Sequence, residues 1–296
     1  MEKLNKLLKE LLKARILYLL MLPAIAYFVI FAYFPVANGI RISFQDFRFI
    51  GESRFVGFKN YVEAIHTHGF WQAFINTVIL GAGNVIFTAF IPMLLALLLN
   101  EVRFAPWKRS IQTLIYMPHL FSWVIVGGIW IFMLSPDAGI INVVRSLLGL
   151  DAIYFMSKEV YARPIMIGVN LWKQAGFVCI LYLASIAGIN PELYEAAMID
   201  GAGSLKRALY ITIPELLGTL KVVLLLNIMG ALRIFNQIYV MRNEVIAPKI
   251  DVLMYYVYVR GLVQFKIGYA SAISMIVFTI TLLITMISNR FIKYSA

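Results

Sequence analysis

The chain has 296 residues, of which 61% are hydrophobic and only 14% charged, whereas ordinary soluble domains are about half apolar and about a quarter charged. The net charge of +11 could indicate a nucleic-acid partner, but the basic residues lie at the ends of long apolar segments, as in integral membrane proteins. One cysteine, Cys179, excludes an internal disulfide. The composition therefore argues against a soluble or nucleic-acid-binding protein and predicts one membrane domain over residues 1–296.

The first fifteen residues, MEKLNKLLKELLKAR, place leucines on one helical stripe opposite lysines. This pattern favours an amphipathic helix on the inner leaflet, although a basic topology anchor would carry the same residue types. Both interpretations keep residues 1–15 in the cytoplasm.

Six apolar segments are long enough to cross a membrane, because about 20 helical residues span a hydrocarbon core of roughly 30 Å. They cover residues 16–34, 74–99, 111–134, 164–189, 216–240 and 267–289. The fourth and fifth segments contain Lys173, Lys221 and Arg233, and no segment contains Asp or Glu. The sequence therefore predicts an all-α integral membrane protein with about six transmembrane helices.

Basic residues are concentrated on one side of these spans. They cluster before the first span, in the connection 101–109 and after the last span. The loops 41–73, 135–163 and 241–266 are longer and carry basic residues more sparsely. Because basic segments stay in the cytoplasm, we expect both termini there, together with the connection between the fourth and fifth spans.

The fourth span carries a lysine near its middle. Lys173 lies about nine residues into the span, where a charge facing lipid costs ~2.5–3.5 kcal/mol, so its side chain should face protein or water. With Asn170, Trp172 and Gln174 it could line a polar path, or it could serve helix packing instead. Gly176 is expected to mark the close approach of another helix.

A short polar segment, residues 190–214, separates the fourth and fifth spans. Asn190 and Pro191 are typical of a helix start, and Gly201 is typical of a helix end. We expect Ser204 to cap a second short helix, and Pro214 to hold the residue before it extended at the start of the fifth span. Such a segment could present a short helix to a soluble partner, or could be a simple connecting loop.

Polar residues recur at three- and four-residue spacing in the fifth span, so several share one helical face. They are Asn227, Gly230, Arg233, Asn236 and Gln237. This face could line a translocation cavity. In the alternative, Arg233 reaches the outer interface and the amides join neighbouring helices.

The sequence lacks the motifs of several enzyme classes. The sequence has no G-x-x-x-x-G-K-[ST], H-E-x-x-H or G-x-S-x-G stretch and no carboxylate cluster, so we expect a non-catalytic subunit. His119 has no nearby acid or cysteine, so no metal site is expected. An ion-coupled secondary transporter remains an alternative, although its spans would lack Asp and Glu and the polar segment would have no role.

The polar segment resembles the EAA loop of permease subunits in bacterial binding-protein-dependent ABC importers. The matching residues are Glu195, Ala196, Ala197, Asp200, Gly201, Ala202, Ile211 and Pro214. LMLPAIAYFVIFAYFP, FINTVIL, LALLLNE, YMPHLFSWVIVGGIW, LWKQAGF and IAGINPELYEAAMIDGAG resemble the sugar branch, which includes maltose-type and polysaccharide-fragment permeases. Leu205 and Ala208 stand where the family often has aromatic residues, and Ile213 stands where leucine is common.

The resemblance implies a fold and a mechanism. In this family the EAA loop is a coupling helix that seats in a cleft of a cytoplasmic ATPase. Glu195 would form an ion pair there, Gly201 would turn the chain, and Ala196 and Ala197 would allow close approach. The ATPases would bind ATP and Mg²⁺, so no cofactor is expected in this chain.

The resemblance also implies partners and a cargo. They are a second permease in a heterodimer, two ATPases, an extracellular solute-binding protein, membrane lipid of a bacterial cytoplasmic membrane, and a saccharide. The predicted docking surface for the binding protein is the outer loop 41–70, with Phe44, Phe47, Phe49, Phe55 and Tyr61. These aromatics could instead form an interfacial belt. An ABC permease for a non-sugar solute remains an alternative.

Overall fold

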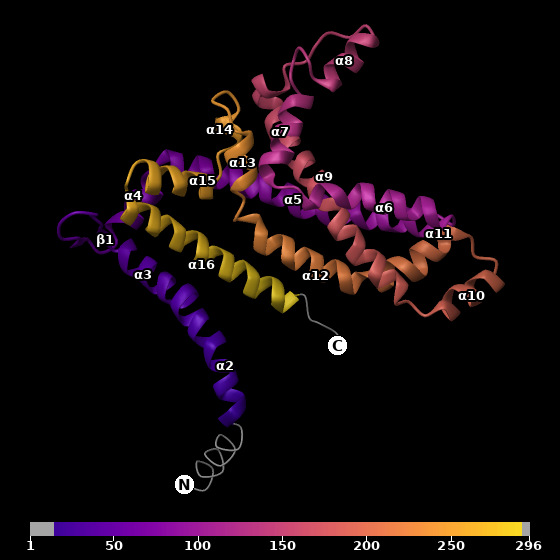
Figure 1. Cartoon of the computed structure of the whole chain (residues 1–296), viewed down its shortest axis with the longest axis horizontal. Helices are drawn as coiled ribbons and strands as arrows, with labels where there is room; N and C mark the ends of the chain where they lie inside the picture. Colours follow the sequence, from indigo (N-terminus) through magenta and orange to yellow (C-terminus); the bar gives the residue numbers. More distant parts are fainter. Residues whose placement is uncertain (1–14, 292–296) are drawn as a thin grey trace. The chain divides into compact units, whose positions relative to one another are not determined.

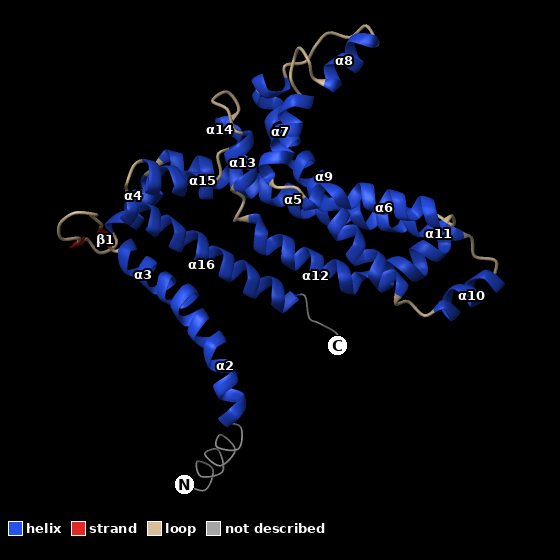
Figure 2. Ribbon diagram, viewed as in Figure 1, coloured by secondary structure: helices blue, strands red, loops and turns tan. Residues whose placement is uncertain are grey.

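The computed structural model describes residues 15–291, so most of the predicted amphipathic segment 1–15 lies outside the described residues. In the described part the regular structure is helical except for β1 (Gln45–Asp46) and β2 (Arg54–Phe55), which pair antiparallel (Figures 1 and 2). The all-α prediction is confirmed. Two compact units are distinguishable, one up to Ala64 with Arg260–Met275, the other Ile65–Val259 with the chain from Ile276. The prediction of one membrane domain stays a prediction.

The first unit begins with a long apolar helix formed by α2 (Arg15–Phe28), the π-helical turn η1 (Val29–Tyr33) and α3 (Phe34–Ser43). The π turn comes just before Pro35, whose ring and missing N–H disturb an α-helical ladder. Because a π turn widens the helix locally, the chain passes the proline without a break. The resulting candidate span, Ile16–Ser43, is longer than the predicted 16–34.

The first unit continues with the β1–β2 hairpin, most of α4 (Lys59–His66), the end of η4 (Val259–Val263) and the start of α16 (Ile267–Phe291). Phe44 lies in an aromatic cluster, with its ring centroid 5.2 Å from that of Phe58 and 5.3 Å from that of Tyr61. Phe49 and Phe55 remain exposed. The aromatic residues of the predicted outer loop therefore build part of this unit's own packing and also leave rings at its surface.

The second unit is a helical bundle. In it α5 (His68–Glu101), α9 (Glu159–Ala187) and α12 (Ile213–Ala231) pack on one another, and α6 (Ala105–Leu120) packs on α9 (Figure 1). Small side chains allow close packing, since Ala89 and Ala96 of α5 are fully buried. The buried Tyr182 of α9 donates its hydroxyl proton to the Ala89 carbonyl oxygen at 3.1 Å. This bundle positions the polar residues predicted for transport.

Gly176 lies where α9 contacts α6, as the sequence predicted. A Cβ there would lie 2.5 Å from the Tyr116 Cα and would also meet the Ile115 carbonyl. Because overpacking against backbone costs about 1–3 kcal/mol, Gly176→Ala should lower the thermal unfolding midpoint of the detergent-purified protein by several degrees. Gly168→Ala on the same helix is the matched control, since its Cβ would meet nothing within 4 Å. Equal midpoints for the two variants would contradict the close approach.

The third predicted span, 111–134, is wrong as a single helix. The chain forms α6 and then α7 (Trp123–Met133), and the two are bent by 106°. Phe121 and Ser122 between them have extended backbone, and the Ser122 hydroxyl accepts a hydrogen bond from the Ile125 N–H at 3.4 Å. Five described helices are thus long and apolar enough to span a membrane, and α6 with α7 would make a sixth, broken span.

The fifth span differs from the prediction at both ends. It begins with α11 (Ser204–Arg207), and the π turn η3 (Ala208–Thr212) joins α11 to α12 without a break, so Ile213 is helical and not extended before Pro214. The π turn accommodates this proline as η1 accommodates Pro35. Helix α12 ends at Ala231, before the predicted end at 240, and α13 (Asn236–Met241) follows a four-residue link, 232–235.

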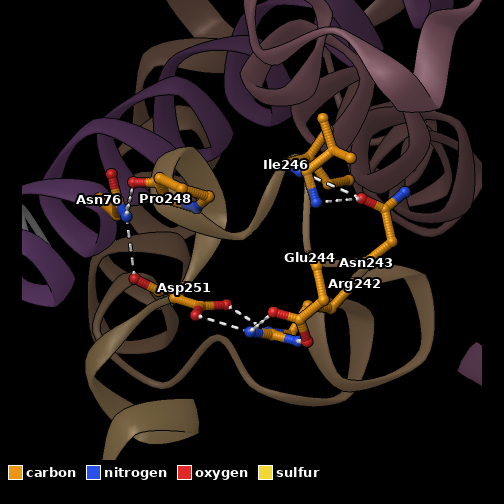
Figure 3. Close-up of polar contacts among 8 residues, drawn as sticks. Asn76, Arg242, Asn243, Glu244, Ile246, Pro248 and Asp251 are labelled. Carbon is orange, nitrogen blue, oxygen red and sulfur yellow. Dashed lines mark hydrogen bonds and ion pairs between the residues drawn. The ribbon is translucent and has the colours of Figure 1, made fainter.

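At the end of the bundle farthest from the segment 190–203, polar contacts join the loops (Figures 1 and 3). Arg242, after α13, bonds to Asp251 at 2.9 Å and to Glu244 at 2.7 Å. Asn76 of α5 donates to the backbone oxygens of Pro248 and Asp251 at 3.1 and 3.0 Å. Burial raises the pKa of the Asp251 carboxyl, and Arg242 offsets only part of this rise. These contacts fix α14 (Ala247–Ile250) and α15 (Leu253–Tyr258) to α5.

The predicted outer loop 135–163 contains α8 (Ile140–Leu147) and the 3₁₀ turn η2 (Phe155–Ser157). Asn142 of α8 donates to the carbonyl oxygens of Ser135 and Ile153 at 3.1 and 2.9 Å. Its side-chain oxygen accepts from the Ile153 N–H at 2.9 Å. One buried amide therefore closes this loop on itself.

Candidate functional site

A cavity of about 360 Å³ lies within the second unit, between α5, α9, α12 and the break between α6 and α7. Its aromatic lining is His119, Trp123, Phe177 and Phe235. Its other polar lining consists of Asn84, Thr88, Asn170, Gln174, Asn227, Arg233, Asn236 and Gln237, and no described lining residue is Asp or Glu. The cavity therefore combines flat aromatic faces with amide groups and one guanidinium.

Seven of the nine residues predicted for a substrate pathway line this cavity, namely Asn170, Gln174, Asn227, Gly230, Arg233, Asn236 and Gln237. Asn170 and Gln174 are four residues apart on α9 and so share one helical face. Trp172 and Lys173 are not part of the lining. Trp172 instead packs edge-on against Trp130, with ring centroids 5.7 Å apart.

Three buried polar atoms along the cavity have no hydrogen-bond partner in the described protein. They are the Asn84 Oδ1, the Thr88 Oγ1 and the Asn227 Nδ2. A buried polar group without a partner costs about 1–3 kcal/mol, so groups of this kind are uncommon unless a ligand or water satisfies them. Thr88 was not predicted as a site residue, although Asn84 and Thr88 are polar residues four apart in the predicted span 74–99.

Other polar lining residues are already bonded within the protein. The His119 Nδ1 and the Gln174 Oε1 are 3.0 Å apart, and the imidazole stacks on Phe177 with centroids 4.7 Å apart. The buried Gln237 donates to the Met166 carbonyl oxygen at 2.7 Å. These contacts hold the cavity walls in place, so Gln237 and His119 are less free to bind a ligand than the unpartnered groups.

Lys173 caps the C-terminal end of α6, at the break between α6 and α7. Its ammonium donates to the carbonyl oxygens of His119 at 2.9 Å, Pro118 at 3.4 Å, and Phe121. It also lies over the Trp123 ring, 5.6 Å from the centroid. The last carbonyls of a helix lack intrahelical partners and carry partial negative charge. The side chain is thus used in a cap and does not point into the cavity as a ligand group.

Arg233 has a different setting from Lys173. It lies in the link between α12 and α13, its side chain is exposed, and it lines the cavity. Within residues 15–291 no side-chain hydrogen bond or ion pair joins Arg233 to another residue. A cation facing lipid would be costly, whereas this cation faces a polar cavity.

The polar segment between the fourth and fifth spans forms α10 (Pro191–Ile199), which begins and ends as predicted. The Asn190 Oδ1 accepts from the Glu192 N–H at 3.0 Å. At the other end, the Ala202 N–H donates to the Ala197 carbonyl at 2.8 Å and Gly201 has a φ of +75°. This is a Schellman motif, in which glycine takes the left-handed position without strain.

The second part of this segment corrects a prediction. Ser204 is the first residue of α11, and Gly203 occupies the N-cap position without a side-chain bond. The Ser204 hydroxyl instead accepts from the Arg207 guanidinium at 3.2 Å. The Tyr194 and Thr212 hydroxyls are 2.9 Å apart, so α10 is tied to the start of the fifth span.

The surface of α10 combines apolar and acidic groups. Ile199 is 87% exposed, and Met198 and Leu193 are also exposed. Glu195 is exposed on the same helix and forms no ion pair with any residue in the described part of the chain. An exposed apolar patch beside an unpaired acid is typical of a protein-interaction surface.

No family model matches the chain. It is 38% identical, over 99% of its length and 92% of the relative's, to the polygalacturonan/rhamnogalacturonan transport system permease protein YteP of Bacillus subtilis. It is 30% identical, over 93% of its length and 92% of the relative's, to the trehalose/maltose transport system permease protein MalF of Thermococcus litoralis. The chain belongs to the permease subunits of ABC sugar transport systems. Its sequence resemblance to this family is confirmed.

Solved structures agree with this membership. A chain of a bacterial alginate ABC transporter, in complex with an alginate pentasaccharide-bound periplasmic protein, matches the permease with a TM-score of 0.89 and 34% identity, and the match covers 96% of each chain. The permease is therefore a multi-pass membrane protein with the ABC importer permease fold. The ion-coupled secondary transporter left open by the composition is excluded.

Proposed function

We propose that this permease forms half of a translocation pathway for an oligosaccharide or polysaccharide fragment, and that the cavity of the second unit is part of that pathway. The observation that carries the proposal is a cavity whose lining includes Asn84, Thr88 and Asn227, each of which has a buried polar atom without a partner in the described protein. Saccharide hydroxyls donate and accept hydrogen bonds, so they match amides and hydroxyls of this kind. The aromatic lining can contact the apolar faces of sugar rings.

The proposed partners are a second, non-identical permease, two cytoplasmic ATPases and an extracellular solute-binding protein. The matched alginate transporter was crystallised with a saccharide-bound periplasmic protein, and this supports a binding protein for the present permease also. The proposed docking surface for it is the outer loop 41–70, where Phe49 and Phe55 are exposed. The permease itself would bind neither ATP nor Mg²⁺ and would not catalyse hydrolysis.

The proposed contact with the ATPases is α10, at the cytoplasmic end of the bundle. Glu195 would pair with a basic residue of the ATPase, while the exposed Ile199 and Met198 would lie in an apolar cleft. The bond between Tyr194 and Thr212 would pass a displacement of α10 to the fifth span, which lines the cavity. Both termini would then lie in the cytoplasm of a bacterium, with the helices in its cytoplasmic membrane.

The cargo is tested with the complete importer in proteoliposomes. ATP hydrolysis is measured after adding binding protein loaded with neutral oligosaccharides, acidic oligosaccharides or amino acids. We expect stimulation by at least one saccharide-loaded form and none by amino-acid-loaded forms. Stimulation only by amino-acid-loaded binding protein would reject a saccharide cargo and favour the non-sugar permease.

A further inference from the structure

Among the described residues, Arg233 is the one formal positive charge in the lining of the cavity. Its guanidinium carries five N–H donors in a fork that matches a carboxylate with two parallel hydrogen bonds. The link 232–235 interrupts the helical path of the fifth span, so Arg233 sits on irregular backbone beside the cavity. Irregular backbone within a membrane chain is tolerated where it is buried in protein or lines a polar cavity.

The charges around Arg233 leave its guanidinium uncompensated within the described part of this chain. The lining contains no carboxylate there, and its other titratable group, His119, lies within hydrogen-bonding distance of Gln174. The ammonium of Lys173 donates its hydrogen bonds to the carbonyl oxygens at the end of α6. Because a positive cavity without acids attracts anions and disfavours cations, its field favours a negatively charged cargo.

We infer that Arg233 recognises a carboxylate of the cargo, and that the saccharide class this permease accepts is acidic, built from uronic acid units. The inference rests on the proposed function, since it assigns the charge of a saccharide in the same cavity. The amides of Asn227 and Asn236 also line the cavity and are available to ring hydroxyls. A neutral saccharide would use those amides and leave the guanidinium without a partner.

The test compares two trisaccharides of one ring skeleton, trigalacturonate and the neutral galactotriose, in uptake by the complete importer. Arg233→Gln should lower the uptake rate of trigalacturonate by about 10-fold or more, which is the effect of losing a hydrogen-bonded charge pair. Arg233→Lys keeps the charge but loses the two-bond geometry, so it should fall between the wild type and Arg233→Gln.

The matched control is Lys221→Gln, which removes an exposed cation from α12, the helix before the link that carries Arg233, outside the cavity lining. It should leave trigalacturonate uptake at the wild-type level. Equal uptake of trigalacturonate by the wild type and Arg233→Gln overturns the inference. So does a drop in thermal stability shared by both Arg233 variants, since Arg233 would then pair with an acid of the second permease.

Failure of the inference differs from failure of the proposed function. Faster uptake of galactotriose than of trigalacturonate by the wild-type importer would reject an acidic cargo but would still agree with a saccharide pathway. A wild-type importer that takes up neither sugar, and whose ATP hydrolysis no saccharide-loaded binding protein stimulates, rejects both.

Discussion

Uptake by the reconstituted importer is expected to fall to background when Glu195→Ala and Gly201→Asp are combined in this permease. The first change removes the exposed carboxylate proposed to pair with the ATPase. The second places a side chain at a φ of +75°, which costs roughly 1–2 kcal/mol, and adds a negative charge at the negative end of α10. Both changes act on the surface and the end of the proposed coupling helix.

The double variant should still fold and insert. A Cβ at Gly201 would meet nothing within 4 Å, so the substitution alters the helix end without disturbing the bundle. Co-purification of the ATPases and cargo-stimulated ATP hydrolysis are the two measurements. Both should be lost while the permease remains in the membrane at its normal abundance.

Glu192→Ala is the matched control for this effect, because it removes another exposed acid from the first turn of the same helix. Acids in a first turn contribute only about 0.3–1 kcal/mol through the helix dipole, so uptake should be nearly normal. Normal ATP-coupled uptake in the Glu195→Ala and Gly201→Asp variant would reject α10 as the contact with the ATPases.

The start and end of α10 could be predicted because short-range chemistry determines them. An asparagine followed by proline starts a helix, and a glycine in the left-handed region ends it, wherever the segment lies in the fold. The continuation of the fifth span's helix through Pro214 could not be predicted from such local signals. Proline excludes an ordinary α-helical turn before it, but the π turn η3 is a second solution that local propensities do not indicate.

The face of the fifth span was predictable for a related reason. Residues three or four apart share a side of any helix, so periodicity alone places Asn227 and Gly230 together. The break at 232–235 was not predictable from that periodicity, because the helical pattern continues through it. Asn84 and Thr88 of α5 join the site only through the packing of α5 against α12, which one span's pattern does not contain.

The role of Lys173 depends on a break that the prediction of one span over 111–134 missed. Pro118 is the local signal for it, because proline kinks or ends a helix, but a proline alone does not show which residue supplies donors to the carbonyls at residues 118–121. Once α6 ends and the chain bends by 106°, those carbonyls need donors, and Lys173 of α9 supplies them. The alternative of helix packing, left open from the sequence, describes its position better than a contact with cargo.

Lys173→Met is therefore expected to destabilise the permease itself, in the absence of cargo and partners. The change keeps most of the side-chain volume but removes the charge-assisted hydrogen bonds to the His119 and Phe121 carbonyls. Hydrogen bonds to charged groups contribute about 1.5–3 kcal/mol, so the thermal unfolding midpoint in detergent should fall by several degrees. The abundance of the permease in the membrane should fall with it.

A lysine that caps a helix and a lysine that binds cargo differ in which measured property changes when the lysine is replaced. Lys221→Met, which removes an exposed lysine from α12, should keep the wild-type midpoint because that ammonium closes no helix end in the described structure. If Lys173 acts as a cap, its variant loses stability whether or not cargo is present, and the uptake that remains keeps the wild-type KM. A wild-type unfolding midpoint combined with a raised KM for Lys173→Met would contradict the role of Lys173 as a cap and would indicate that it binds cargo. A ligand group contributes to cargo binding and adds nothing to the stability of the empty protein.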